Sequence, residues 1–238
     1  MTFTILGRDP KTGELGIAIA TYSLAVGATC PKILPGIAVA TTQASTNPVI
    51  AEEIMELIAN GNDPIKAFME GLGNDEHAEF RQVALMLSEG RPLIHSGVKI
   101  KPVSGHLNGR NCTAVGNFLA NDEVLSAIVD GFENPDIPVE VECSLANRLL
   151  SALNSGKQAG GQSGADGSHL NERSACLLVG SPDETFPIDI RIDASENAIL
   201  ELRSSYDKYL LMHDFYLQRA DDPTMLPSQD DWVQSLKP

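Results

Sequence analysis

Residues 2–22 read TFTILGRDPKTGELGIAIATY, two apolar stretches joined by a short polar segment. Threonine, isoleucine and tyrosine are typical of strands, whereas the segment RDPKTG contains the Asp-Pro pair and the glycine that turns favour. The pattern therefore predicts strands over 2–7 and 14–22, paired as an antiparallel hairpin. Alternate residues of the second strand are small, yet both of its faces are apolar, so we expect both faces to be covered.

The remainder of the chain interleaves strands with pairs of helices. Further strands are predicted over 36–43, on either side of Gly90 within 80–97, and over 109–120, 173–180 and 186–193. Helices are predicted over 47–61, 62–73, 122–133 and 145–156, and from Ser195 onward. This order favours an α+β fold in which helices cover two stacked, mainly antiparallel sheets. A doubly wound parallel sheet is the alternative, which the opening hairpin and the absence of GxGxxG after a strand weaken.

The 238 residues include 17 Lys and Arg against 32 Asp and Glu, a formal net charge of -15 with no basic run. This balance argues against partners such as nucleic acid and anionic lipid. No apolar run approaches the ~20 residues that span a bilayer, and the N-terminus lacks the features of a secretion signal. We therefore expect a cytoplasmic protein with no nucleic-acid and no membrane partner.

The length suits one domain, which we place at residues 1–212. The segment 213–238 is acidic, contains proline and is aperiodic from about Asp214. We expect this segment to be an arm that packs on its own or a neighbouring subunit, and the protein to be a homo-oligomer.

Cysteine and histidine spacing offers no metal site. The four cysteines are widely separated without a CxxC pair, and the five histidines form no HExxH motif. The chain is too large to need a disulfide framework. We expect free, mostly buried thiols, no metal and no cofactor.

Four stretches read together carry a family resemblance: TFTILGRDPKTGELGIAIATYSLAVGA (2–28), TTQASTNP (41–48), GNFLA (116–120) and RSACLLVG (173–180). They resemble the bacterial family called domain of unknown function 1028, which is placed in the Ntn-hydrolase (N-terminal nucleophile) superfamily. The resemblance covers residues 2 to about 212. It implies a four-layer αββα sandwich and amide-bond hydrolysis, with no substrate known for the family. The chain departs from the family in its longer glycine-rich loop, which lacks the arginine after Gly-Gly.

Thr2 is the nucleophile that this resemblance implies. Once Met1 is removed, an N-terminal threonine offers a hydroxyl and an α-amine with a pKa of ~7.7 to 8.0, which can accept the hydroxyl proton directly or through one water. While Met1 stays attached, the nitrogen of Thr2 is a peptide amide and cannot act as a base. The alternative for Thr2 is an ordinary strand residue.

Hydroxyl attack on an amide creates an oxyanion that needs hydrogen-bond donors about 3 Å away. Asn117 is the first choice for the donor, and Gln43 and Asn47 are the second. Asn47 equally fits the N-cap of a helix that begins at Pro48. Asn117 is therefore a candidate catalytic residue, and Gln43 and Asn47 are candidate substrate-binding residues.

Two further residues are candidates near Thr2. Ser23, at the end of the second strand, is expected to hydrogen-bond to Thr2. Arg173 can hold a substrate carboxylate or pair with one of the many acidic residues. Both assignments depend on where the strands place these side chains.

Three classes of function remain open. The first is a cofactor-independent hydrolase of a small-molecule or peptide-like amide, with Thr2 as nucleophile. The second is a non-catalytic binding or assembly protein on the same fold. The third is an enzyme with an internal nucleophile such as Cys112, for which a buried thiol is the alternative.

Overall fold

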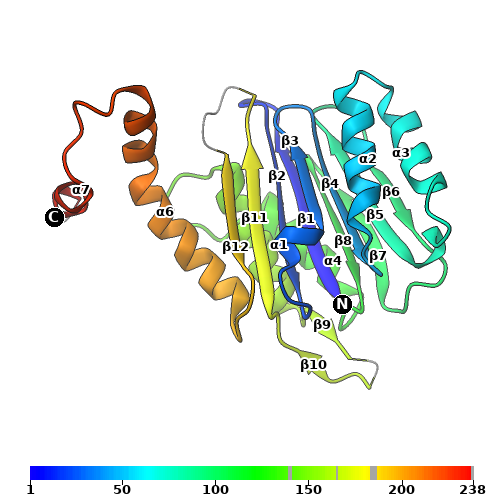
Figure 1. The fold of residues 1–238 in the computed structure, drawn as a ribbon. Coiled ribbons are helices and arrows are strands. Elements are labelled where there is room, and N and C mark those ends of the chain that lie inside the picture. The colour runs from blue at the N-terminus through cyan, green and yellow to red at the C-terminus, as the bar shows by residue number, and fades with distance from the viewer. Residues whose placement is uncertain (139–140, 165, 183–186, 237–238) are drawn as a thin grey trace.

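Two antiparallel sheets form the centre of the protein. The computed structural model describes residues 1–138, 141–164, 166–182 and 187–236. Sheet A contains β1 (Thr2–Asp9), β2 (Glu14–Thr21), β7 (Ser104–Gly109), β8 (Cys112–Asn117), β11 (Ser174–Gly180) and β12 (Ile188–Ile192), in the order β12–β11–β2–β1–β8–β7. Sheet B contains β3 (Pro31–Leu34), β4 (Ala38–Ala44), β5 (Arg81–Leu87) and β6 (Leu93–Ser96), in that order. Figure 1 shows the two sheets stacked face to face.

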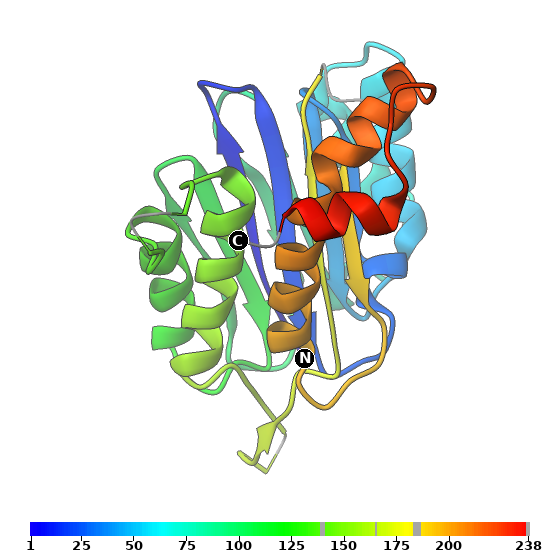
Figure 2. The same ribbon diagram turned by 90° about the vertical axis from the view of Figure 1, so that its left-hand side faces the viewer.

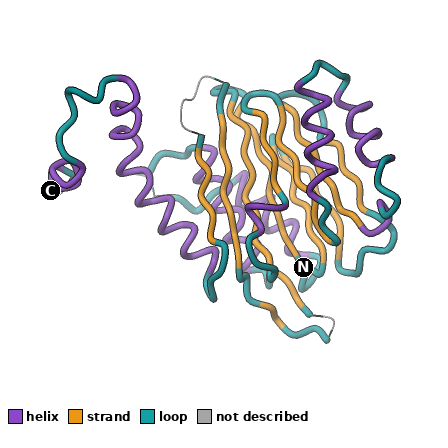
Figure 3. Tube along the Cα trace, in the orientation of Figure 1, coloured by secondary structure: helices purple, strands orange, loops and turns teal. Residues whose placement is uncertain are grey.

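Helices cover the outer face of each sheet. On sheet A lie α4 (Glu123–Glu133), α5 (Leu145–Gln158) and α6 (Ala198–Asp221), and on sheet B lie α2 (Pro48–Ala59) and α3 (Pro64–Gly73). Figure 2 shows the four layers from the side, and Figure 3 distinguishes the helices from the strands in the orientation of Figure 1. The α+β sandwich expected from the sequence is therefore confirmed. Among the described residues, no helix is long and apolar enough to cross a bilayer.

The opening hairpin forms because its turn satisfies its own backbone. Gly13 adopts a φ of 76°, which favours glycine, and donates its N–H to the carbonyl of Asp9 at 2.9 Å. The Asp9 carboxylate accepts the N–H of Lys11. Tight turn closure fixes the register, so that Thr2 lies opposite Thr21 at the far end of the hairpin.

The alternation of strand side chains creates separate apolar layers. On β1, Phe3 and Ile5 pack against α4 and α5, while Leu6 points between the sheets. A third cluster, around Ile54 and Phe68, joins sheet B to α2 and α3. Since sheet A has helices on one side and sheet B on the other, both faces of β1 are buried.

Several short elements lie outside the sequence prediction. These are α1 (Val26–Thr29), β3, the 3₁₀ turn η1 (Ala78–Phe80), β7, and the pair β9 (Gln162–Ser163) and β10 (His169–Leu170) within the glycine-rich segment. The polar sequence SGHLNG of β7 carries no apolar alternation because this strand lies at an edge. Residue 186 of the expected strand 186–193 lies outside the described residues.

The expectation of an aperiodic segment from Asp214 is wrong, because α6 continues to Asp221 and the expected boundary at 212 falls inside this helix. The second half of α6 extends beyond the body, as Figure 1 shows, so no continuous apolar stripe marks it in the sequence. A further helix, α7 (Gln229–Ser235), folds back on it. Trp232 packs against Phe215, with ring centroids 5.5 Å apart, and donates to the carbonyl of Leu211.

Leu153 and Leu200 offer a matched test of the layer between sheet A and its helices. Leu153 is fully buried in that layer, whereas Leu200 is 67% exposed on α6. We expect Leu153→Ala to lower the free energy of unfolding by about 2 to 5 kcal/mol, because it leaves a cavity. Leu200→Ala should change it by less than about 0.5 kcal/mol. Urea unfolding measures both, and equal losses would contradict this assignment of the core.

Candidate functional site

The space between the two sheets changes from apolar to polar along the strands. Towards the β1–β2 turn it is filled by aliphatic side chains such as Leu6, Ile17 and Val39. Towards the N-terminus it holds buried hydroxyl and carboxamide side chains, from Thr2, Thr4, Thr21, Gln43, Gln82 and Asn117. We call these six residues the polar core. Thr2, the most exposed of them, is only 5% exposed.

Gln82 organises the polar core because its amide orientation is forced. Its Nε2 lies 3.0 Å from the carbonyl oxygen of Gly116 and 3.2 Å from that of Gly105, and a carbonyl can only accept. Its Oε1 therefore faces the nitrogens of Gln43, at 2.8 Å, and Asn117, at 3.1 Å. The two neighbouring amides are thereby oriented as well.

This orientation has different consequences for the two neighbours of Gln82. The oxygen of Gln43 accepts the hydroxyl of Thr4 at 2.8 Å, so both ends of that amide are paired. The oxygen of Asn117 is fully buried and has no hydrogen-bond partner. The polar core therefore contains an acceptor that lacks a donor.

Thr21 connects Thr2 to the residue that precedes it. The two threonine hydroxyl oxygens lie 3.0 Å apart, and the Thr21 hydroxyl also donates to the carbonyl oxygen of Met1. Since that carbonyl only accepts, the single proton of Thr21 points to Met1, and the hydroxyl of Thr2 donates to Thr21. The Ser23 backbone N–H lies 3.4 Å from the same Thr21 oxygen.

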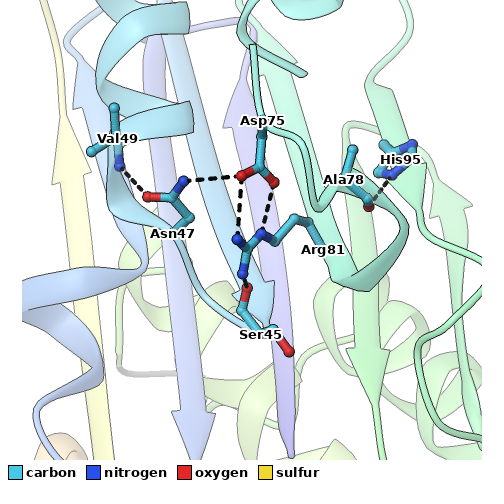
Figure 4. A network of polar contacts seen from close by, with 7 residues as sticks. All are labelled: Ser45, Asn47, Val49, Asp75, Ala78, Arg81 and His95. Carbon is cyan, nitrogen blue, oxygen red and sulfur yellow. Dashed lines mark hydrogen bonds and ion pairs between the residues drawn. The ribbon is translucent and has the colours of Figure 1, made fainter. Parts of the chain in front are cut away.

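The loop after β4 borders this end of the sandwich and is held by an ion pair (Figure 4). Arg81 binds both carboxylate oxygens of Asp75, at 2.8 and 3.2 Å, and donates to the carbonyl of Ser45 at 2.6 Å. The guanidinium of Arg81 lowers the pKa of the Asp75 carboxyl. The loop is thus fixed where Thr46 places its hydroxyl 3.7 Å from the sulfur of Cys30.

Three residues with left-handed backbone conformation lie at the ends or exits of strands around the polar core. Ala44 follows Gln43 with a φ of 71°, Phe118 follows Asn117 with a φ of 55°, and Ala25 follows β2 with a φ of 55°. This conformation is unfavourable for residues with a Cβ atom and is concentrated at functional sites. The backbone is therefore locally strained at the ends or exits of these strands.

The predicted residues fall into two groups. Gln43 and Asn117 join Thr2 in the polar core. Ser23 is exposed, and the hydroxyl that contacts Thr2 belongs to Thr21 instead. Ser23 contributes its backbone: its carbonyl accepts the hydroxyl of Ser174 at 2.7 Å.

Asn47 and Arg173 lie outside the polar core. Asn47 caps α2, accepting the N–H of Val49, and donates to Asp75 at 3.4 Å, so its side chain has the capping role (Figure 4). The guanidinium of Arg173 lies over the ring of Tyr22, 5.1 Å from its centroid. The backbone N–H of Arg173 donates to the carbonyl of Thr21.

The sequence reading missed Thr21 and Gln82, although each left a signal. In a hairpin that pairs Asp9 with Glu14, counting back along the two strands places Thr21 opposite Thr2. Gln82 is a lone carboxamide in the apolar strand RQVALML, and a buried polar residue among apolar ones needs dedicated partners. Its partners come from β4, β7 and β8 and, through the hydroxyl of Ser96 at 3.1 Å, from β6. Local sequence patterns cannot reveal partners on four different strands.

The metal-binding side chains and cysteines of the described residues form no second candidate site. No group of three or more metal-binding side chains occurs there, and all four cysteines are free, three of them buried. Burial raises the pKa of the Cys112 thiol to about 12, so it carries almost no thiolate at neutral pH. A groove of about 870 Å³ between α5 and α6 is lined by none of the polar-core residues.

Three solved structures resemble this chain to different degrees. The crystal structure of protein SPO2555 from Silicibacter pomeroyi, described with the family model DUF1028, is 29% identical in sequence to this chain. The match covers 87% of this chain and 85% of that chain, with a TM-score of 0.75. An Anbu (Gly-1) mutant from Hyphomicrobium sp. strain MC1 is 12% identical over 88% and 95% of the two chains, with a TM-score of 0.40. Anbu (ancestral beta-subunit) from Yersinia bercovieri is 10% identical over 95% and 98%, with a TM-score of 0.37.

No curated protein matches the chain. The model of the "Family of unknown function (DUF1028)" matches residues 2–202, which is most of the sequence. The protein therefore belongs to the DUF1028 family.

Proposed function

We propose that this protein is a cofactor-independent hydrolase of a small amide or peptide-like bond, with Thr2 as its nucleophile after removal of Met1. The observation that carries the proposal is the shared contact at Thr21, whose hydroxyl binds both the hydroxyl of Thr2 and the carbonyl of Met1. An acyl carbonyl is thus already held beside the proposed nucleophile. That is the arrangement an amide substrate would need.

Removal of Met1 would change the chemistry of the site in two ways. The nitrogen of Thr2 becomes an amine that can take the proton of its own hydroxyl, directly or through one water. Thr21 also loses the acceptor of its proton, so its hydroxyl becomes free to bind Thr2 or a substrate carbonyl. Thr21 therefore acts as a positioning residue for the nucleophile.

The polar core suits an uncharged carbonyl group. Its six side chains are hydroxyls and carboxamides, and none carries a charge. Asn117 gives one N–H to Gln82 and keeps a second for an oxyanion, which supports its predicted role as a donor. The substrate-binding role of Gln43 stays a prediction, since both ends of its amide are paired inside the protein.

Met1 covers the site in the unprocessed chain. Burial lowers the pKa of its α-amino group from 8.0 to about 6, against an opposing interaction with Cys30. A buried terminus of this kind lies where part of a substrate would lie. Release of Met1 would therefore open the space next to Thr2 and create its base in a single step.

A binding or assembly protein without catalysis is the second candidate. It is favoured by the 5% exposure of Thr2 while Met1 is attached, and by the exposed apolar residues Leu211 and Met225 beyond the body. The proposed cytoplasmic location and homo-oligomeric state belong equally to both candidates. The state of the N-terminus in the native cell separates them.

Thr2→Val tests the nucleophile. We expect the intact mass of untagged native protein to lack Met1, and a β-lactone probe to acylate that protein at Thr2. Thr2→Val keeps the shape of the side chain but removes the hydroxyl, so acylation should fall at least about 100-fold. Peptide mapping locates the adduct. Retention of Met1 in all native protein, or undiminished labelling of the variant, would exclude the hydrolase proposal.

Thr21→Val tests the positioning residue. Loss of the contact with Thr2 should slow β-lactone acylation by about 10-fold or more without abolishing it, because the nucleophile remains. Ser23→Ala should slow it less, since only the backbone of Ser23 contacts Thr21. The two acylation rates at a fixed probe concentration decide between them. A larger loss in Ser23→Ala would assign the role to Ser23.

The buried amine of Met1 predicts a pH dependence of stability in the unprocessed protein. Between pH 8 and about 6 the unfolded chain binds the proton that the folded chain excludes, so the free energy of unfolding should fall as the pH falls through this window. Below it, this group contributes no further change. Denaturant unfolding of unprocessed protein and of an N-acetylated form, which lacks the titrating amine, isolates the effect. Identical pH profiles would contradict the burial of this terminus.

A further inference from the structure

We infer that the buried amide oxygen of Asn117 accepts a hydrogen bond from the α-amino group of Thr2 once Met1 has been removed, and so sets the pKa of the catalytic base. The inference rests on the proposed function, because it concerns the same nucleophile. It gives Asn117 a positioning role in addition to its predicted role as an oxyanion donor.

The starting observation is the unpaired Oδ1 of Asn117. The side chain is fully buried, and this oxygen has no hydrogen-bond partner within the described structure. Buried carboxamide oxygens are nearly always paired, because an unpaired one forfeits its hydration without replacement. A donor is therefore missing from the unprocessed chain.

The alternative explanation, a reversed amide, is excluded by Gln82. The Gln82 nitrogen faces the two carbonyls of Gly105 and Gly116, so its oxygen must face Asn117. A reversed Asn117 amide would place its oxygen 3.1 Å from that oxygen with no hydrogen between them, so the nitrogen of Asn117 faces it, beside the nitrogen of Gln43. The other end of the Asn117 amide is consequently an acceptor in every consistent assignment.

The missing donor can come from Thr2. Thr2 and Asn117 are direct partners in the antiparallel pairing of β1 with β8, and both side chains point between the sheets. Side chains of such partners have Cβ atoms about 4.5 to 5.5 Å apart. Cleavage before Thr2 replaces a planar amide carrying one hydrogen with an amine that rotates and carries up to three.

None of the six polar-core side chains carries an ionisable group. The neighbouring strands contribute neutral groups, namely Thr4 on β1, Thr21 on β2, Gln43 on β4 and Gln82 on β5. The titratable group that interacts with the present terminus is the Cys30 thiol, just before β3, and burial raises its pKa so that it is uncharged at neutral pH. The amide oxygen of Asn117 is then a polar group that counteracts desolvation of the protonated amine.

The test uses the full chain beginning at Thr2, released from an N-terminal fusion by a protease that leaves no extra residue. Threonine labelled with ¹³C at Cα allows the α-amine to be titrated by NMR. We expect Asn117→Leu to lower the pKa of this amine by about one, because the protonated form loses an acceptor. Asn117→Asp should raise it, because a carboxylate replaces the amide.

Gln43→Met is the matched control. Like Asn117→Leu, it removes one donor from the Gln82 oxygen, but it leaves the Asn117 oxygen in place. Its amine should titrate as in the parent protein. An unchanged pKa in Asn117→Leu, or an equal change in the control, would overturn the inference.

A structure of the chain that begins at Thr2 provides a measurement that does not depend on any variant folding. We expect the Thr2 nitrogen within about 3.2 Å of the Asn117 oxygen. A separation above about 4 Å would overturn the inference and leave a substrate N–H as the donor. Neither measurement requires turnover, so a protein that hydrolyses nothing can still confirm this contact, and an active one can still refute it.

Discussion

Two stacked sheets must bury the whole of their inner faces, and at one end this protein does so with amides and hydroxyls. The arrangement is stable only if those groups find partners inside the protein, because water is excluded. Gln82 meets this requirement by joining the backbone of β7 and β8 to the side chains of Gln43 and Asn117. The orientations of the Gln43 and Asn117 amides both depend on this one residue.

The same constraint explains how a strand residue can have a special role. Thr2 lies on the central part of sheet A, between β2 and β8, where rigid pairing on both sides fixes its backbone. The loop after β4, whose backbone is strained at Ala44, is held as well, by the ion pair of Arg81 and Asp75. A site on strand ends gains rigidity that a surface loop does not provide.

The sequence predicted the layers better than the contacts. Period-two alternation and helix caps such as Asp63 and Asn47 are local signals, and the helices on sheet B follow them closely. The edge strand β7 and the outer half of α6 escaped prediction because neither buries a continuous face. The pairing of Thr2 with Thr21 was within reach of hairpin counting, but the role of Gln82 was not, since its partners are distant in sequence.

Trp232 is the single tryptophan of the chain, and it packs on Phe215 in the C-terminal helices rather than among the layers of the sandwich. Its indole N–H is bound to the carbonyl of Leu211, on the same long helix. Intrinsic fluorescence excited at the indole band therefore reports the docking of α7, and a change in emission can precede any loss of the sheets. Far-ultraviolet dichroism follows the body of the molecule, and the two signals together distinguish detachment of the C-terminal helix from global denaturation.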